Sequence, residues 1–358
     1  MNSDKYRKKV LYIVNHFKYH GGIERMLSNK IDAWIEEYGY EVVVVTINQN
    51  NAPILYPPKN DFKLVDLKIQ RKKKRYSVYE LFTLTSKVNK ILKKESPDIV
   101  ITTLTGIPSL ILPFILPKIN KVLEIHSSGA LSVTKSWKYK WWFLNRYHKI
   151  VLLNEDEKQY YQLNNLTVIP NFIQIDSGEH IVYRYRQKKI ISAGRIHPDK
   201  QYDHLIKIWE KIYKEHPAWN LEIYGNGDED LLNEYIAYIN QYNIGRINFL
   251  PATSNLKEVM GISSILCLTS QTESFGMVLL ECKWAALPAV SYDSPNGPRH
   301  IISDDGLLLE HNNIEKFASE LSHLIMDEEK REKFSENAFQ NRHRFSAKEV
   351  IKKWNDLL

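Results

Sequence analysis

The stretch KKIISAGRIHPDKQYDHLIKIWEKI, residues 188–212, decides the fold of this chain. Its β-branched beginning predicts a strand, the glycine after it predicts a turn, and the apolar residues at helical spacing beyond predict an amphipathic helix. The same pattern recurs in NLEIYGNGDEDLLNEYI, residues 220–236, and near the N-terminus, where VLYIV is followed by Gly21-Gly22 and another helical pattern. Strands that alternate with helices predict a parallel sheet with helices on both faces.

The length of the chain, 358 residues, predicts two domains rather than one core. Pro170-Asn171 is the predicted exit from the first domain. We therefore expect doubly wound α/β domains at residues 1–172 and 173–340, and an amphipathic C-terminal helix within residues 341–358 that packs back on the first domain. Two such halves joined by one linker predict a cleft between them.

The charge balance favours an anionic partner. Lys and Arg number 49 against 42 Asp and Glu, a formal net charge of +7. Such an excess suits an anionic ligand or an anionic surface. Nucleic acid is not the expected partner, because no aromatic-and-basic stacking motif of the kind that binds bases accompanies the excess charge.

Three features favour a cytoplasmic location. Cys267 and Cys282 lie in apolar contexts, which predicts neither a disulfide nor a zinc site and favours a reducing compartment. The N-terminal MNSDKYRKK lacks the apolar core of a signal peptide. The longest apolar run, residues 107–117, holds three prolines and is too short to span a bilayer, so no transmembrane segment is expected.

The stretch TESFGMVLLECKWAALPAV, residues 272–290, sets Glu273 and Glu281 eight positions apart. On a helix that spacing stacks two side chains on one face, where one long ligand can touch both. Ser274-Phe275-Gly276 is expected at the helix start, where free backbone N–H groups favour anions. A sugar nucleotide, rich in hydroxyls and negatively charged, fits this pairing. In the alternative interpretation Glu281 faces solvent and Glu273 only caps the helix.

Arg195 and Lys200 share one predicted loop between a strand and a helix. A forked guanidinium and an ammonium in one loop can hold a diphosphate between them. The alternative is a pair of solvated surface cations, which are common in a basic chain.

Two candidates lie in the N-terminal half. The pair Gly21-Gly22 lets backbone amides approach a phosphate or a sugar closely, although many such turns use glycine only for tightness. His126 follows the strand pattern KVLEI, and ligands of open α/β sheets bind beyond the carboxyl ends of strands. A purely structural histidine is the alternative.

Asp228-Glu229-Asp230 is similar to an acidic metal-binding triplet. Acids at the start of a helix also favour its dipole without any metal. Because the basic loop already supplies positive charge for a phosphate, no metal and no other cofactor is expected.

Six motifs in this order resemble the retaining glycosyltransferases of family 4: HGGIER, EIHSS, VIPNF, AGRIHPDK, EIYGNGDE and TESFGMVLLE. The resemblance covers nearly the whole chain and implies the GT-B architecture, in which two doubly wound Rossmann-like domains face a cleft. The N-terminal domain would lie on the acceptor side and the C-terminal domain would bind the nucleotide sugar. The chain departs from the family at Gln201 and Leu287, where glycines are usual, which affects turn geometry more than chemistry.

The resemblance also implies residue roles. Arg195 and Lys200 would bind the donor diphosphate, which Gly21 and Gly22 would approach, and His126 would lie near the reacting carbon. The remaining contacts to the donor would come from Glu281 to the ribose, from Glu273 to the sugar, and from the amides of Phe275, Gly276 and Met277.

The implied activity is the transfer, with retention, of a hexose or N-acetylhexosamine from a nucleoside-diphosphate sugar, expected to be UDP-linked. SYDSPNGPRHII, residues 291–302, resembles the subset that builds bacterial capsule, O-antigen and lipopolysaccharide, so the expected acceptor is a growing glycan on a polyprenyl diphosphate. A sugar-nucleotide epimerase of similar architecture and a non-catalytic nucleotide-sugar sensor are the alternatives.

Two basic and aromatic stretches predict peripheral contact with the anionic inner face of the cell membrane: RKKKRYSVYELF, residues 71–82, and KSWKYKWWFLNRYHK, residues 135–149. In the second, the residues at helical spacing are Trp137, Trp141, Leu144 and His148. Aromatic rings prefer the headgroup level, and basic residues are attracted to anionic lipid. In the alternative, the tryptophans pack against the sheet and the lysines are solvated.

Overall fold

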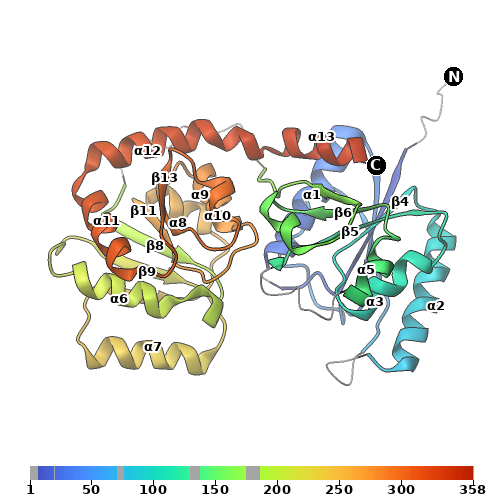
Figure 1. Ribbon diagram of the computed structural model, residues 1–358, viewed down its shortest axis with the longest axis horizontal. Coiled ribbons are helices and arrows are strands. Elements are labelled where there is room, and N and C mark those ends of the chain that lie inside the picture. The colour runs from blue at the N-terminus through green and yellow to red at the C-terminus, as the bar shows by residue number, and fades with distance from the viewer. Residues whose placement is uncertain (1–6, 20, 71–75, 130–137, 175–185, 358) are drawn as a thin grey trace. The chain divides into compact units, whose positions relative to one another are not determined.

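The structure is a computed structural model that describes residues 7–19, 21–70, 76–129, 138–174 and 186–357 (Figure 1). The chain divides into two compact units, Met1–Gln174 with Ala347–Leu358, and Ile175–Ser346. The sequence placed these divisions at 172/173 and 340/341. Each unit is a parallel sheet covered by helices, as the alternating pattern predicted.

Unit 1 contains a seven-stranded parallel sheet in the order β3-β2-β1-β4-β5-β6-β7. Runs of valine, isoleucine and leucine form its central strands because both faces of the sheet are covered. The strands are β1 Lys9–Val14, β2 Glu41–Thr46, β3 Lys63–Asp66, β4 Ile99–Thr102, β5 Asn120–Glu124, β6 Lys149–Leu152 and β7 Leu166–Val168.

Alternate residues of these strands face two different helical layers. Tyr12 of β1 packs toward α1 and α13, whereas Leu11 and Ile13 pack toward α2 and the segment that follows α3. The helices are α1 Gly22–Tyr38, α2 Val78–Glu95, α3 Ile107–Ile111, α5 Lys138–Leu144 and α13 Ala347–Leu357, with 3₁₀ turns η1 Leu112–Phe114 and η3 Asp156–Tyr160.

The C-terminal helix α13 belongs to unit 1, where the sequence placed it. Val350, Ile351 and Trp354 recur at helical spacing and are buried against α1 and the sheet. The chain therefore returns to its N-terminal unit after completing the second one.

Unit 2 contains a six-stranded parallel sheet in the order β10-β9-β8-β11-β12-β13. Its strands are β8 Lys189–Ala193, β9 Asn220–Tyr224, β10 Ile247–Leu250, β11 Ile265–Leu268, β12 Ala289–Tyr292 and β13 Gly306–Leu309. Its helices are α6 Tyr202–Ile212, α7 Glu229–Gln241, α8 Leu256–Ile262, α9 Met277–Trp284, α10 Pro298–Ile301, α11 Ile314–Met326 and α12 Glu328–Asn341, with 3₁₀ turns η5 Pro198–Lys200 and η6 Arg342–Phe345.

Cys267 and Cys282 are buried and free in unit 2. Burial raises the pKa of both thiols, that of Cys282 to about 12. Both are therefore inert parts of the core. None of the helices in the described ranges is long and apolar enough to cross a membrane.

Candidate functional site

The strand order of unit 2 reverses between β8 and β11, which are neighbours at the centre of the sheet. The connections leaving these two strands run to opposite sides, and ligands of open α/β sheets bind beyond the carboxyl ends of the strands at such a reversal. The loop after β8 carries Arg195 and Lys200, and the loop after β11 carries Glu273. The fold thus places three of the predicted residues at its topological switch point.

Lys200 and Glu273, 73 positions apart in the sequence, form an ion pair with 2.7 Å between Nζ and Oε2. The two side chains are 22% and 16% exposed, so the pair is only partly removed from water. An ammonium has three donors and a carboxylate has several acceptor positions. Both partners can therefore bind further groups without separating.

Hydrogen bonds tie the two loops into one piece. Thr269 Oγ1 donates to the carbonyl oxygens of Lys200 and Gln201, both at 3.1 Å, and Gln271 N donates to Asp199 O at 2.8 Å. Gln201 adopts the left-handed conformation, with φ 46° and ψ 48°. The turn therefore keeps a glycine-like geometry although the chain departs from the family at this position.

Arg195 is exposed in the same loop, between β8 and η5. Its guanidinium makes no hydrogen bond or ion pair with any residue in the described part of the chain. Five donors in a planar fork suit a bidentate anion such as a phosphate.

Glu273 lies in extended backbone and not on a helix. Its N–H donates to Pro295 O at 2.9 Å, and its carbonyl oxygen accepts from Asn296 N at 3.1 Å and Gly297 N at 2.7 Å. Helix α9 begins only at Met277. The prediction that Glu273 and Glu281 stack on one helix face is therefore wrong, and so is the alternative in which Glu273 caps the helix.

The reason for the late helix start is Gly276, the N-cap of α9, which has φ 95°. This conformation favours glycine and separates the extended segment from the helix. Phe275 is buried and packs edge-to-face on Phe345, so only its backbone is available to a ligand. The first amides of α9, beginning with Met277, are those that a helix leaves without internal acceptors.

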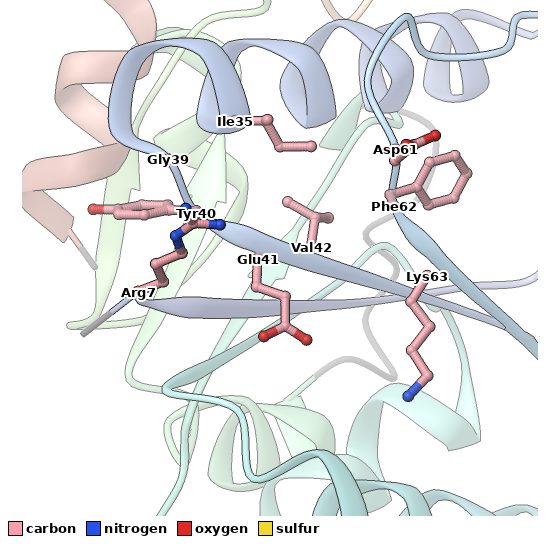
Figure 2. Close-up of a pocket in the computed structure, with 9 residues that line it drawn as sticks. All are labelled: Arg7, Ile35, Gly39, Tyr40, Glu41, Val42, Asp61, Phe62 and Lys63. Atoms are coloured by element: carbon pink, nitrogen blue, oxygen red, sulfur yellow. The ribbon is translucent and has the colours of Figure 1, made fainter. Parts of the chain in front are cut away.

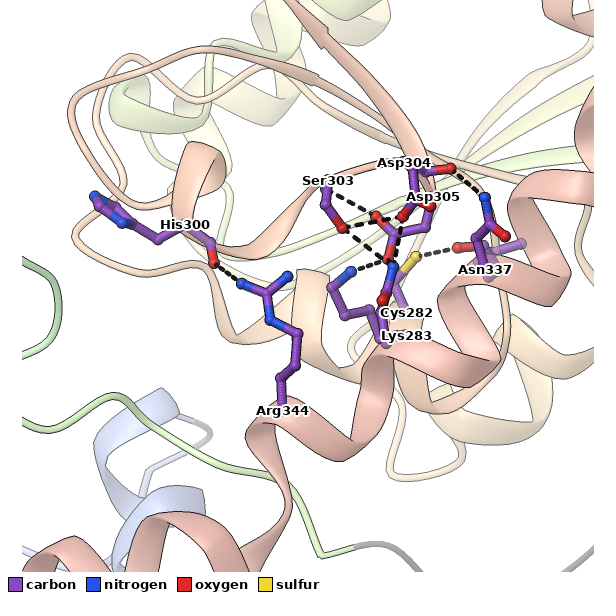
Figure 3. Close-up of polar contacts among 10 residues, drawn as sticks. Cys282, Lys283, His300, Ser303, Asp304, Asp305, Asn337 and Arg344 are labelled. Carbon is purple, nitrogen blue, oxygen red and sulfur yellow. Dashed lines mark hydrogen bonds and ion pairs between the residues drawn. The ribbon is translucent and has the colours of Figure 1, made fainter.

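A polar network fixes the far end of α9, on which Glu281 lies (Figure 3). Lys283 forms a buried ion pair with Asp305, and burial lowers the pKa of Lys283 to about 8. Asn341 donates to Asp304 Oδ1 at 2.7 Å, and this hydrogen bond lowers the pKa of Asp304. The network joins α9 to the turn before β13 and to α12. Sequence analysis missed it, although adjacent aspartates before a glycine were a visible signal.

In unit 1, Gly21 is the N-cap of α1 and Gly22 is its first residue. The nearly buried carboxylate of Glu24 lies against Gly21, because a Cβ atom added to Gly21 would overlap Glu24 Oε2. Glu24 Oε1 lies 3.1 Å from Nδ1 of His16. This acid and histidine give the glycine loop polar groups that the sequence analysis did not identify, although Glu24 is part of HGGIER.

His126 lies two residues beyond the end of β5. Its Nε2 is 3.7 Å from Oε1 of Glu124, which forms a buried ion pair with Lys30 of α1. The Lys30 ammonium also lies 3.8 Å from the ring centroid of Trp354 in α13. Burial lowers the pKa of Lys30 and raises the pKa of Glu124, because the low dielectric disfavours both charged forms. The ion pair places a fixed carboxylate beside His126.

Two comparisons of sequence agree with this geometry. Residues 182–341 match the family described as Glycosyl transferases group 1, and residues 20–177 match Glycosyltransferase Family 4. The amylovoran biosynthesis glycosyltransferase AmsD of Erwinia amylovora is 26% identical over 365 residues, which cover 98% of this chain and 99% of AmsD. The chain belongs to the glycosyltransferases.

Solved structures share the fold of this glycosyltransferase. A variant of S. aureus TarM, crystallised with fondaparinux, α-GlcNAc-glycerol and UDP, matches with a TM-score of 0.80 at 17% identity over 98% of this chain and 99% of TarM. Anabaena HepE, crystallised with UDP and glucose, matches with a TM-score of 0.79 at 15% identity over 97% of this chain and 98% of HepE. The two parallel α/β units are those of the GT-B fold.

One hollow in the described residues of unit 1 does not lie at this site (Figure 2). It has a volume of about 750 Å³ and is lined by Arg7, Ile35, Gly39, Tyr40, Glu41, Val42, Asp61, Phe62 and Lys63. These residues surround the amino ends of β1, β2 and β3. Because open α/β sheets bind ligands beyond their carboxyl ends, we do not assign the donor to this hollow.

The acidic triplet of the glycosyltransferase begins with a helix cap. Asp228 Oδ1 accepts from Leu231 N at 3.1 Å and caps α7, which accounts for the first acid of the triplet. Among the residues that the structure describes, no group of three or more His, Cys, Asp and Glu side chains is arranged to hold a metal ion.

Proposed function

We propose that the enzyme transfers a hexose or N-acetylhexosamine from a UDP-sugar, with retention, onto a growing surface glycan linked to a polyprenyl diphosphate. The observation that carries this proposal is the Lys200–Glu273 pair at the switch point, with the Arg195 guanidinium in the same loop. A sugar nucleotide presents a diphosphate beside hydroxyl groups. Two cations next to a carboxylate match that order of groups.

The transfer requires stabilisation of the negative charge that develops on the leaving nucleoside diphosphate. The bond between the anomeric carbon and the phosphate oxygen breaks, and the acceptor oxygen bonds to the same face of that carbon. The acceptor proton passes to the leaving phosphate oxygen. Arg195 and Lys200 stabilise the negative charge that develops on the diphosphate. Glu273 accepts hydrogen bonds from the sugar hydroxyls while it keeps the Lys200 ammonium in place.

The other residues hold the rest of the substrates. Glu281 on α9 binds the ribose hydroxyls, and the amides of Phe275, Gly276 and Met277 lie beside the sugar. His126, beside the fixed carboxylate of Glu124, lies near the reacting carbon. Gly21 and Gly22 approach the diphosphate, where the neighbouring Glu24 and His16 offer hydrogen-bonding partners.

UDP is the proposed nucleotide because TarM and HepE were both crystallised with it. The surface glycan is proposed because the relative AmsD is named for amylovoran biosynthesis and 291–302 resembles enzymes of such pathways. A lipid-linked glycan is made at the inner face of the cell membrane, so the enzyme is expected in the cytoplasm and at that surface.

The first test measures thermal unfolding of the full chain with UDP, GDP and ADP. A ligand that binds only the folded state raises Tm by mass action, and UDP is expected to give the largest shift. Turnover of UDP-sugars is then measured with and without a glycan acceptor. Turnover that requires the acceptor supports transfer. Conversion of the free sugar nucleotide would support an epimerase, and binding without any turnover would support a sensor.

A further inference from the structure

Helices α2, α3 and α5 and the 3₁₀ turn η1 cover the same face of the unit 1 sheet. Residues of α2 and η1 share one core cluster with the strands, and residues of α3 and α5 pack in the adjoining cluster on that face. Figure 1 shows α2, α3 and α5 side by side. Their outer surfaces therefore belong to one face of the unit, which we call the α2–α5 face.

Large aromatic side chains are exposed on this face. Trp142 is 56% exposed, Phe114 is 44% exposed and Phe143 is 36% exposed. The rings of Phe114 and Trp142 stack with centroids 5.8 Å apart, and Phe143 meets Trp142 edge-on at 5.0 Å. The Arg146 guanidinium lies 4.7 Å from the Trp142 ring. The rings thus form a contiguous exposed cluster with a cation on it, and exposed clusters of this kind mark interaction sites.

This arrangement differs from the predicted row of Trp137, Trp141, Leu144 and His148 at helical spacing. Leu144 is buried and Trp141 packs on the core, as the alternative interpretation held. His148 lies beyond the end of α5, and Trp137 lies outside the described residues. The outward side chains are those one and two positions after Trp141.

The first turns of α2 add a second exposed apolar group. Val78 is 85% exposed, Tyr79 is 78% exposed and Phe82 is 72% exposed. A capping box fixes the start of this helix, because Ser77 Oγ accepts from Glu80 N at 3.2 Å and Ser77 N donates to Glu80 Oε2 at 2.7 Å. The opposite side of α2 is buried, so these three side chains are held outward.

The exposed charge of the face is positive. In the described residues 76–92 the one acid, Glu80, is held in the capping box, and Lys87 and Lys90 are exposed. In the described residues 99–129 and 138–154 the one acid, Glu124, is buried against Lys30, and Lys118 and Arg146 are exposed. A surface of this sign attracts an anionic partner.

We propose that the α2–α5 face docks on an anionic lipid bilayer. Tryptophan, tyrosine and phenylalanine rings enter the interface at headgroup level, and the surrounding lysines and arginines contact lipid phosphates. The combination of exposed rings and an excess of positive charge selects an anionic membrane rather than a neutral one. This inference goes beyond glycosyl transfer and does not depend on the identity of the donor.

The test is sedimentation of the full chain with phosphatidylglycerol-containing vesicles and with pure phosphatidylcholine vesicles, without donor or acceptor. Binding to the anionic vesicles is expected at low ionic strength and decreases as salt screens the charges. Replacement of Trp142 and Phe82 by serine is expected to lower the bound fraction at least tenfold. The matched control is Tyr242→Ser, which removes a ring that is 50% exposed in unit 2 and is expected to bind as the wild type does.

A second pair of variants distinguishes the contribution of the basic residues to vesicle binding from that of the aromatic rings. Lys118→Glu with Arg146→Glu is expected to abolish binding, whereas Lys207→Glu with Lys333→Glu, the same change of charge on unit 2, is expected to retain it. All variants are compared by Tm and by turnover on a soluble acceptor, both of which should match the wild type. Vesicle binding unchanged in the ring variant would overturn the proposal, as would a wild-type protein that ignores phosphatidylglycerol at low salt. Normal vesicle binding with lost turnover in the ring variant would instead assign the rings to the glycan.

Discussion

Two lysine–glutamate pairs in this glycosyltransferase make the same contact in opposite environments. Lys30 and Glu124 in unit 1 have side chains that are each 1% exposed, whereas Lys200 and Glu273 in unit 2 are 22% and 16% exposed. Both glutamates lie at or beyond the carboxyl end of a strand near the centre of a parallel sheet. Burial is therefore the difference that separates their roles.

The buried pair cannot exchange partners. Each charge has lost its hydration, and the Trp354 ring covers the ammonium. Removal of one partner leaves the other charged in a low-dielectric site or forces it to change its protonation state. The Lys200–Glu273 pair is partly exposed to water, so a diphosphate or a sugar hydroxyl can replace that water at little cost. The first pair is suited to hold a structure, and the second is suited to bind a ligand.

The largest expected effect is on stability, from Lys30→Ala. Loss of one partner of a buried pair is expected to lower the free energy of unfolding by about 3–5 kcal/mol, measured by urea denaturation. The control is Lys316→Ala, which breaks a surface pair with Glu320 and should cost less than about 1 kcal/mol. Equal losses in the two variants would show that burial does not distinguish these pairs.

Arg195→Ala and Lys200→Ala should act on turnover instead. Each removes a charge-assisted contact worth about 1.5–3 kcal/mol, which corresponds to about one to two decades in rate, while Tm stays near the wild-type value. Lys207→Ala removes a lysine of α6 that pairs with Asp203 on the surface, and it should leave the rate unchanged. Near-normal rates in both loop variants would remove the diphosphate clamp from the mechanism.

A smaller effect is expected from the double variant Lys30→Met with Glu124→Gln. Neutral side chains of similar volume avoid the unpaired charge, so most of the stability lost in Lys30→Ala should return. Turnover should still decrease by about one decade, because His126 no longer has a carboxylate beside it. If this variant folds and works at the wild-type rate, Glu124 does not act through His126.

The strands of both sheets were accessible to sequence analysis because β-branched runs repeat between glycine turns. The run VLYIV near the N-terminus became part of β1, Lys9–Val14, for this reason. β13, Gly306–Leu309, was missed because it is a short edge strand of leucines, which are not typical of strands. The extended conformation of Glu273 was missed because the helical pattern was extended back across Gly276, whose positive φ separates the two segments.

The Lys30–Glu124 and Lys200–Glu273 pairs show that a single sequence does not reveal which distant residues are in contact. Lys30 and Glu124 are 94 positions apart, and their contact depends on how α1 lies on β5. A signal was nevertheless present, because Lys30 shares the helical spacing of the buried residues Leu27, Ile31 and Trp34. For Lys200 and Glu273 the sequence identified both residues as ligand contacts, but the strand order that joins their loops is a property of the sheet.

The smallest effect is expected from removal of divalent metal. In many phosphoryl and glycosyl transfers a metal ion neutralises the diphosphate, and in this site Arg195 and Lys200 would supply two positive charges for that purpose. Asp228 is engaged as the cap of α7 through its hydrogen bond from Leu231 N. We therefore expect the rate with excess EDTA to equal the untreated rate, in assays of transfer from a UDP-sugar to a soluble acceptor. The Lys200→Ala variant sharpens the test, since added Mg²⁺ should not restore its rate if the lysine contact is direct. Complete inhibition by EDTA that Mg²⁺ or Mn²⁺ reverses would contradict the metal-free clamp. It would instead support metal binding by Asp228, Glu229 and Asp230.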